Sequence, residues 1–293
     1  MTNLPLSRKA ADRLPCLAPS PISLKGAGPT PEIRLEALTT RVLRALSKSA
    51  QERLGEELSE LYRQAFPKMT TELREEFLQN YFKTTREGFH RQALFFRDPE
   101  DRLHGTALFD QGMVTHGEAR LRAIYINARA IRPESQGASL GKEIASRILS
   151  ELAPDILFTT ATQSASLHSW IGMGRRPAGA DFEVWPRITE DRPDRFFTLP
   201  PDRMPLILGA FRQAYREINP DGELSVRRAL DNLTPRMVRR NLQDRVYDFE
   251  AWFREDRPDP LANHLNLTER DGVLVVFLRK ALPGAQEGHQ PHR

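Results

Sequence analysis

Apolar residues in the first third of the chain recur at the spacing of a helix. The repeat runs through residues 35–46, 51–67 and 71–85, with apolar side chains three or four positions apart. Pro67 ends the second segment, because proline cannot continue a helix. The pattern therefore predicts three helices, with order beginning near Pro31.

The pattern changes to short apolar runs after about residue 90. Two turn signals, Asp-Pro at 98–99 and His-Gly at 116–117, separate these runs. The runs predict three strands, at 91–97, 103–114 and 119–131.

The rest of the chain alternates helices and strands before it turns helical. Apolar residues from Leu140 to Leu152 fall at steps of four, which makes residues 139–153 an amphipathic helix packed on a sheet. The later expected elements are a strand at 155–162, a helix at 164–174, a strand at 181–188, helices at 203–218, 224–230 and 234–253, and a strand at 271–281.

Composition narrows the class of protein. With 293 residues, 39% of them hydrophobic and 28% charged, the chain can form one large globular domain or two small ones. No apolar run reaches the roughly 20 residues of a membrane-spanning helix, and the N-terminus lacks the apolar core of a signal peptide. Cys16 is the single cysteine, so no internal disulfide can form and a cytoplasmic location is expected.

The stretch RPESQGASLGKE, residues 132–143, joins small residues to the start of a helix. Small side chains leave the unpaired N–H groups of the first turn accessible, and the helix dipole attracts anions to that end. Lys142 adds a cation where positive charge is unfavourable unless an anion binds. The stretch indicates a phosphate site. The alternative is a tight loop whose small residues serve helix–sheet packing.

The same stretch resembles the acyl-CoA-binding motif of the GCN5-related N-acetyltransferase (GNAT) family. That motif is Arg/Gln-x-x-Gly-x-Gly/Ala, after a strand and at the start of a helix. Gln136 and Gly141 match it, and Ser139 stands where glycine is usual. The later segment QSASLHSWIGMG is similar to the family's next helix, with Gln163 in place of Asn and Trp170 in place of Tyr.

The resemblance covers about residues 90–190 and implies an α/β (α+β) fold. The expected centre is a mixed, mostly antiparallel sheet flanked by helices, with a C-terminal helical insertion. The implied division is a disordered tail at 1–31, a GNAT-like domain at 32–190 completed by a strand at 271–281, a helical insertion at 191–270, and a loose tail at 282–293.

Acetyl-CoA or another acyl-CoA is the cofactor that the resemblance implies. Its pyrophosphate would lie on the helix N-terminus, and its pantetheine arm along the preceding strand. The residues expected to bind it are Ile131, Arg132, Gln136, Gly137, Ala138, Ser139, Leu140, Gly141, Lys142, Gln163 and Trp170. No metal site is expected.

Acyl transfer to an amine needs a deprotonated nucleophile, stabilised charge on the thioester oxygen and a proton for the leaving thiolate. The family's glutamate base corresponds to Tyr125, and a phenol, with a reference pKa of about 10, is a weak base at neutral pH. Tyr125, Asn127 and Arg129 alternate onto one face of their strand. Tyr125, Asn127 and His168 are the expected catalytic residues.

The sequence thus favours an acyl-CoA-dependent N-acyltransferase, most simply an acetyltransferase. The expected acceptor is an amine-bearing small molecule, a protein or a peptide. One alternative is a non-catalytic GNAT-fold module that senses CoA or binds proteins. Another is a nucleic-acid-binding regulator, suggested by Arg227-Arg228 and Arg239-Arg240. A net charge of +4 spread over the whole chain makes nucleic acid the least favoured partner, and no membrane partner is expected.

Overall fold

The computed structural model describes residues 21–23, 32–67, 69–83, 85, 88–136, 140–161, 164–185, 187–188, 196–197, 203–218, 236–238 and 271–282. Its strands are β1 Pro21–Ser23, β2 Glu32–Thr39, β3 Phe89–Arg97, β4 Leu103–His116, β5 Ala119–Ile131, β6 Ile156–Ala161, β7 Phe182–Trp185, β8 Arg187–Ile188, β9 Phe196–Phe197, β10 Arg236–Val238 and β11 Asp271–Arg279. Its helices are α1 Thr40–Ala45, α2 Lys48–Ala65, α3 Thr71–Phe82, α4 Leu140–Glu151, α5 Ser164–Met173 and α6 Met204–Ile218, with short 3-10 helices η2 Pro133–Ser135 and η3 Pro177–Gly179.

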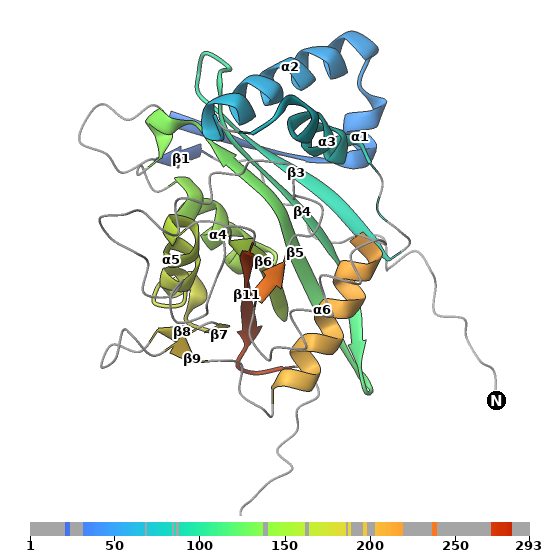
Figure 1. Cartoon of the computed structure of the whole chain (residues 1–293), viewed down its shortest axis with the longest axis vertical. Helices are drawn as coiled ribbons and strands as arrows, with labels where there is room; N and C mark the ends of the chain where they lie inside the picture. Colours follow the sequence, from blue (N-terminus) through green and yellow to red (C-terminus); the bar gives the residue numbers. More distant parts are fainter. Residues whose placement is uncertain are drawn as a thin grey trace, which may run out of the picture.

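A nine-stranded sheet forms the centre of the fold (Figure 1). Its strand order is β1-β2-β3-β4-β5-β6-β11-β10, and β7 also pairs with β11. Only the β5–β6 pair is parallel among the described strands; the other neighbours run antiparallel. The predicted mixed, mostly antiparallel sheet flanked by helices is confirmed.

Helices cover both faces of this sheet. One face carries α1–α3 over β3, β4 and the end of β5, and α6 over the other end of β4 to β6 and β11. Helices α4 and α5 pack on the opposite face. Figure 1 shows α1–α3 on one side of β3, β4 and β5, and α4 and α5 on the other. None of the helices in the described ranges is long and apolar enough to cross a bilayer.

The first predicted helix, at 35–46, is wrong over residues 35–39. Residues 32–39 form β2, and only Thr40–Ala45 is helical, with the Thr39 side chain accepting from the Val42 N–H. Leu35 and Leu38 have helical spacing, yet they lie on opposite faces of β2, against α4 and α1–α3 respectively. A strand covered on both faces carries apolar residues at odd and even positions, which imitates a helical repeat.

Two other expectations about the ends of the chain also change. Pro21–Ser23, inside the predicted disordered tail, forms β1 and pairs with β2. Arg236–Val238, inside the predicted helix at 234–253, forms β10 and pairs with β11. The rest of that helix and the one at 224–230 lie outside the described residues. The helices at 51–67, 71–85 and 203–218 and the strand at 271–281 are confirmed within a few residues.

A β-bulge interrupts β5 at Asn127. Leu108 pairs with Ala128 and Phe109 with Ile126, so Asn127 is the extra residue. The bulge exchanges the faces of the strand, because side-chain direction alternates with every residue. Tyr125 therefore packs toward α6, whereas Arg129 packs toward α4 and α5. The prediction that Tyr125, Asn127 and Arg129 share one face is wrong for this reason.

Candidate functional site

The parallel strands β5 and β6 part next to the bulge. They pair over residues 123–126 and 156–159. Beyond this, β5 continues along β4, and β6 continues along β11. The parting starts at the bulge because an extra residue bends a strand and increases its twist. Both strands lead to the edge where α4 and α5 begin, and ligands of α/β proteins bind at edges of this kind.

Beyond the bulge, some main-chain groups of β5 point toward the side where β6 no longer pairs with it. The Arg132 N–H donates to the His104 carbonyl of β4 at 2.9 Å, and main-chain groups alternate in direction along a strand. Arg129 and Ile131 therefore turn their N–H and C=O groups away from β4. The Ile131 carbonyl accepts a hydrogen bond from Gln136 Nε2 at 3.0 Å. This edge can pair with an extended ligand as a sheet edge pairs with a peptide.

The Arg129 guanidinium lies at the first turn of α4. It donates to the Gly141 carbonyl at 3.2 Å and to the Ser166 hydroxyl at 3.3 Å, and its Cζ lies 4.8 Å from the centroid of the Trp170 ring. Burial lowers the pKa of Arg129 to about 10, so the group stays charged at neutral pH. No carboxylate pairs with it in the described part of the chain. A desolvated cation of this kind attracts an anion.

Gly141 has a packing role that the motif does not reveal. A Cβ at this position would lie 3.1 Å from Arg129 Nη1 and 3.2 Å from Ile131 Cδ1. The space beside Gly141 is therefore filled by side chains from β5, which favours the packing explanation for this glycine. The neighbouring Leu140 side chain is buried in the core beneath α4. Lys142 in the same turn is half-buried and makes no ion pair within the described residues.

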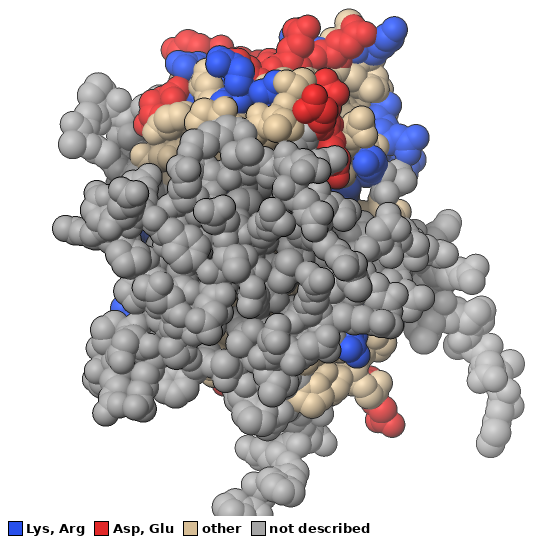
Figure 2. Space-filling model, in the orientation of Figure 1, with Lys and Arg blue, Asp and Glu red and all other residues tan. Residues whose placement is uncertain are grey.

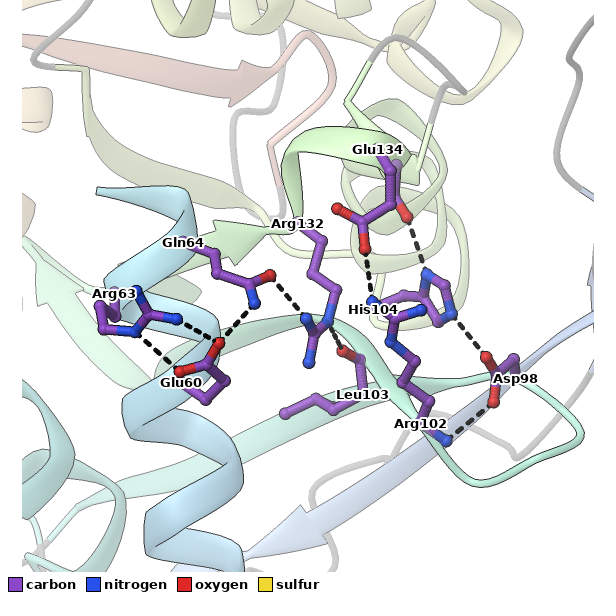
Figure 3. A network of polar contacts seen from close by, with 10 residues as sticks. Glu60, Arg63, Gln64, Asp98, Arg102, Leu103, His104, Arg132 and Glu134 are labelled. Carbon is purple, nitrogen blue, oxygen red and sulfur yellow. Dashed lines mark hydrogen bonds and ion pairs between the residues drawn. The ribbon is translucent and has the colours of Figure 1, made fainter. Parts of the chain in front are cut away.

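Part of the predicted cofactor set cannot be placed. Gly137, Ala138, Ser139 and Gln163 lie outside the described residues. The guanidinium and the N–H of Arg132 already donate hydrogen bonds within the protein. Its guanidinium donates to Gln64 Oε1 at 2.6 Å and to the Leu103 carbonyl at 2.5 Å, and its N–H is taken by β4. Figure 3 shows these contacts between the end of β5 and α2. We therefore remove Arg132 from the cofactor set.

A buried ion pair holds the bulge residue from the other face of the sheet. Asp110 of β4 is completely buried and accepts two hydrogen bonds from Arg91 of β3, both at 2.8 Å. Asn127 Nδ2 also donates to Asp110. Because a carboxylate only accepts, the Asn127 amide is oriented with its Oδ1 pointing away from Asp110. Sequence reasoning missed Asp110, although a charge inside the apolar run TALFDQGMV was a signal for it.

The structure does not bring all three predicted catalytic residues together. Tyr125 is 6% exposed on the α6 face of the sheet, with its hydroxyl 3.5 Å from Thr160 Oγ1 and its ring near Phe211. Asn127 follows two residues later at the bulge. His168 is exposed on α5, which covers the opposite face. Trp170 is buried beneath Arg129 and packs edge-on against Phe277, so it supports Arg129 from below.

On the face drawn in Figure 2, the described residues form no patch of only basic or only acidic side chains. Acidic and basic side chains lie side by side over the α1–α3 layer. The arginine pairs at 227–228 and 239–240, on which the nucleic-acid hypothesis rests, lie outside the described residues.

Within the described ranges, no group of three or more His, Cys, Asp and Glu side chains is placed to hold a metal ion.

No family model matches the sequence, and a search of curated proteins finds no match. Solved structures do resemble it. A histone acetyltransferase HPA2-related acetyltransferase from Corynebacterium glutamicum is 14% identical over 54% of this chain and 89% of its own, with a TM-score of 0.34. A GCN5-related N-acetyltransferase from Kribbella flavida is 14% identical over 47% of this chain and 33% of its own, with a TM-score of 0.31.

An aminoglycoside 6'-N-acetyltransferase complexed with coenzyme A is also similar, at 14% identity over 39% of this chain and 59% of its own, with a TM-score of 0.28. Identities and TM-scores this low do not assign a family or an activity. We therefore base the function on the residues of this chain.

Proposed function

We propose that this protein is an acyl-CoA-dependent N-acyltransferase, most simply an acetyltransferase, which moves an acyl group directly from CoA to an amine. The observation that carries the proposal is the parting of β5 from β6 at the Asn127 bulge, on the edge where α4 begins. This arrangement puts an open strand edge next to a helix N-terminus. The first suits an extended arm that contains amides, and the second suits phosphate.

The residues at this edge match the chemistry of acyl-CoA. The main-chain groups of Arg129 and Ile131 would pair with the amides of the pantetheine arm. The first turn of α4, with Lys142, would bind the diphosphate. The Arg129 guanidinium, which has no carboxylate partner in the described residues, adds positive charge beneath that turn. In this set the binding roles fall on backbone and cations, as an anionic, amide-rich donor requires.

The acceptor would approach beside Asn127, on the face that α6 and α3 flank. Asn127 Nδ2 is held by Asp110, so Oδ1 would accept an N–H of the amine and orient its lone pair. The Tyr125 hydroxyl lies on the same face. A phenol, with a reference pKa of about 10, is better suited to give a proton to a departing thiolate than to deprotonate an ammonium group. We assign no role to His168, because it lies across the sheet.

Calorimetric titration of the full chain with acetyl-CoA and with CoA tests the proposal directly. Binding of both, followed by release of free CoA when a panel of small amines and peptides is added, is the expected result. A folded protein that binds neither acetyl-CoA nor CoA would overturn it. Acetyl-pantetheine, which lacks the nucleotide and diphosphate, is the matched donor, and we expect it to bind more weakly.

One observation favours the second candidate, a CoA-binding module without turnover. The carboxylate next to the bulge, Asp110, is locked in a buried pair with Arg91 and cannot serve as a base without breaking it. Tight CoA binding with no CoA release across the whole amine panel would select this alternative.

A further inference from the structure

Three buried side chains form a hydrogen-bonded relay just before the loop that leads into α4. Asp98 follows β3, His104 lies in β4 and Ser135 ends η2. His104 Nε2 lies 2.7 Å from Asp98 Oδ2, and its Nδ1 lies 2.8 Å from Ser135 Oγ. The exposed fractions are 9% for Asp98, 7% for His104 and 5% for Ser135. Figure 3 shows Asp98 and His104 within the wider polar network.

The chemistry of the partners fixes where the protons lie. Burial alone would raise the pKa of Asp98, but hydrogen bonds from His104 and from the amides of Arg102 and Glu100 lower it further than burial raises it. Asp98 is therefore a carboxylate at neutral pH and can only accept, so His104 Nε2 carries a hydrogen. In a neutral imidazole, Nδ1 then accepts, and the Ser135 hydroxyl donates to it.

This relay is tied to the main chain at the start of the loop. The Ser135 N–H donates to the Arg132 carbonyl at 2.9 Å, and the Gln136 N–H donates to the same carbonyl at 3.0 Å. Arg132 is held separately by Gln64 and Leu103. Loss of the Ser135 hydroxyl would therefore remove the link between η2 and His104 and leave the end of β5 in place.

A hydrolytic role for Ser135 does not fit. The hydroxyl is 5% exposed, and the amide that follows it, on Gln136, already donates within the turn. The N–H groups of Ser135 and Gln136 both donate within the turn, so neither is left to stabilise an oxyanion beside the hydroxyl. The relay is thus placed to hold a backbone segment, not to attack a substrate.

We propose that Asp98, His104 and Ser135 are positioning residues that fix η2, ahead of the N-terminus of α4, for the phosphate-bearing end of the acyl donor. This inference rests on the proposed function. The charged side chains Arg102, Glu134 and Arg132 lie in the same polar network, and none of them is hydrogen-bonded to the imidazole.

The test compares Ser135→Ala with Glu134→Gln on the same turn of η2. Glu134 pairs with Arg102 at the surface, and both side chains are about half exposed, so this variant is the control. CoA binding is measured by calorimetry at a single pH. Wild type and Glu134→Gln should bind CoA alike.

Ser135→Ala should bind CoA about tenfold more weakly than wild type, the effect of one lost buried hydrogen bond. Its affinity for acetyl-pantetheine should equal that of wild type. Should Ser135→Ala fail to fold, Ser135→Cys takes its place, because a thiol is still a weak donor. Its affinity for CoA should lie between the wild-type value and the tenfold weaker one. Wild-type CoA affinity in Ser135→Ala would overturn the relay alone. Failure of wild type to bind CoA would overturn the proposed function and the relay with it.

Discussion

Replacing Arg129 with methionine should weaken donor binding and leave the fold nearly as stable as before. Burial lowers the pKa of Arg129 well below its ordinary value, to about 10, which corresponds to a desolvation cost of about 3 kcal/mol. Two hydrogen bonds, at 3.2 and 3.3 Å, and the stacking on Trp170 together stabilise the folded state by a similar amount and offset this cost. Methionine keeps an apolar stem on the Trp170 ring, so the unfolding free energy should change by less than about 2 kcal/mol.

Arg91 is the matched control, because it is a second buried arginine that does have a carboxylate partner. It forms two hydrogen bonds of 2.8 Å with Asp110, which is completely buried. Arg91→Met would leave that carboxylate uncompensated in the core. Breaking a buried pair in this way costs about 3–5 kcal/mol. The two variants therefore separate an arginine that stabilises the sheet from one that we expect to serve a ligand.

The assay pairs urea denaturation, followed by tryptophan fluorescence, with calorimetric titration of CoA. Arg129→Met should unfold near the wild-type urea concentration and bind CoA at least about tenfold more weakly, since a charge-assisted contact is lost. Arg91→Met should unfold at much lower urea. Equal destabilisation by both variants, with CoA affinity unchanged in Arg129→Met, would refute the assignment of Arg129 to the donor.

Three further predictions concern neighbouring residues. The pKa of Asp98 lies below its ordinary value of 3.8 in the folded protein. Its charge therefore stabilises the fold above about pH 4, and this contribution is lost as the pH falls below that value. The difference in melting temperature between wild type and Asp98→Asn should shrink between about pH 6 and about pH 3. Gly141→Ala should lower the free energy of unfolding by about 1–3 kcal/mol, because the added methyl group crowds Arg129. In a double-mutant cycle, the same substitution should destabilise Arg129→Met less than it destabilises wild type. Strictly additive effects would contradict the packing role. Asn127→Ala should lower kcat with little change in the KM for the acyl donor, and Tyr125→Phe should lower kcat because the phenol would no longer supply the proton; unchanged steady-state kinetics in both would remove these residues from the acceptor side.

Local sequence signals predicted the middle of the sheet because turns divide it. Asp-Pro and His-Gly separate β3, β4 and β5, and each strand then follows from its apolar run. The β2 strand was missed because helices cover both of its faces, so its apolar residues follow no period of two. The site was predicted only where a local motif marked it. The contacts of Arg129 with Gly141 and Trp170, and of Asp110 with Asn127, join residues that periodicity does not relate.

The bulge at Asn127 is the feature that joins the fold to the proposed chemistry, and no residue type in the sequence marks it. Without the extra residue, Tyr125 and Arg129 would share a face, as alternation predicts. With it, Tyr125 stays on the face of Asp110 and α6, and Arg129 passes to the side where α4 begins. The same extra residue frees the edge of β5 from β6. One inserted residue thus separates the groups that would hold the donor from those that would meet the acceptor. Deleting Asn127 should therefore abolish both CoA binding and the separation of faces, whereas Asn127→Ala should spare CoA binding.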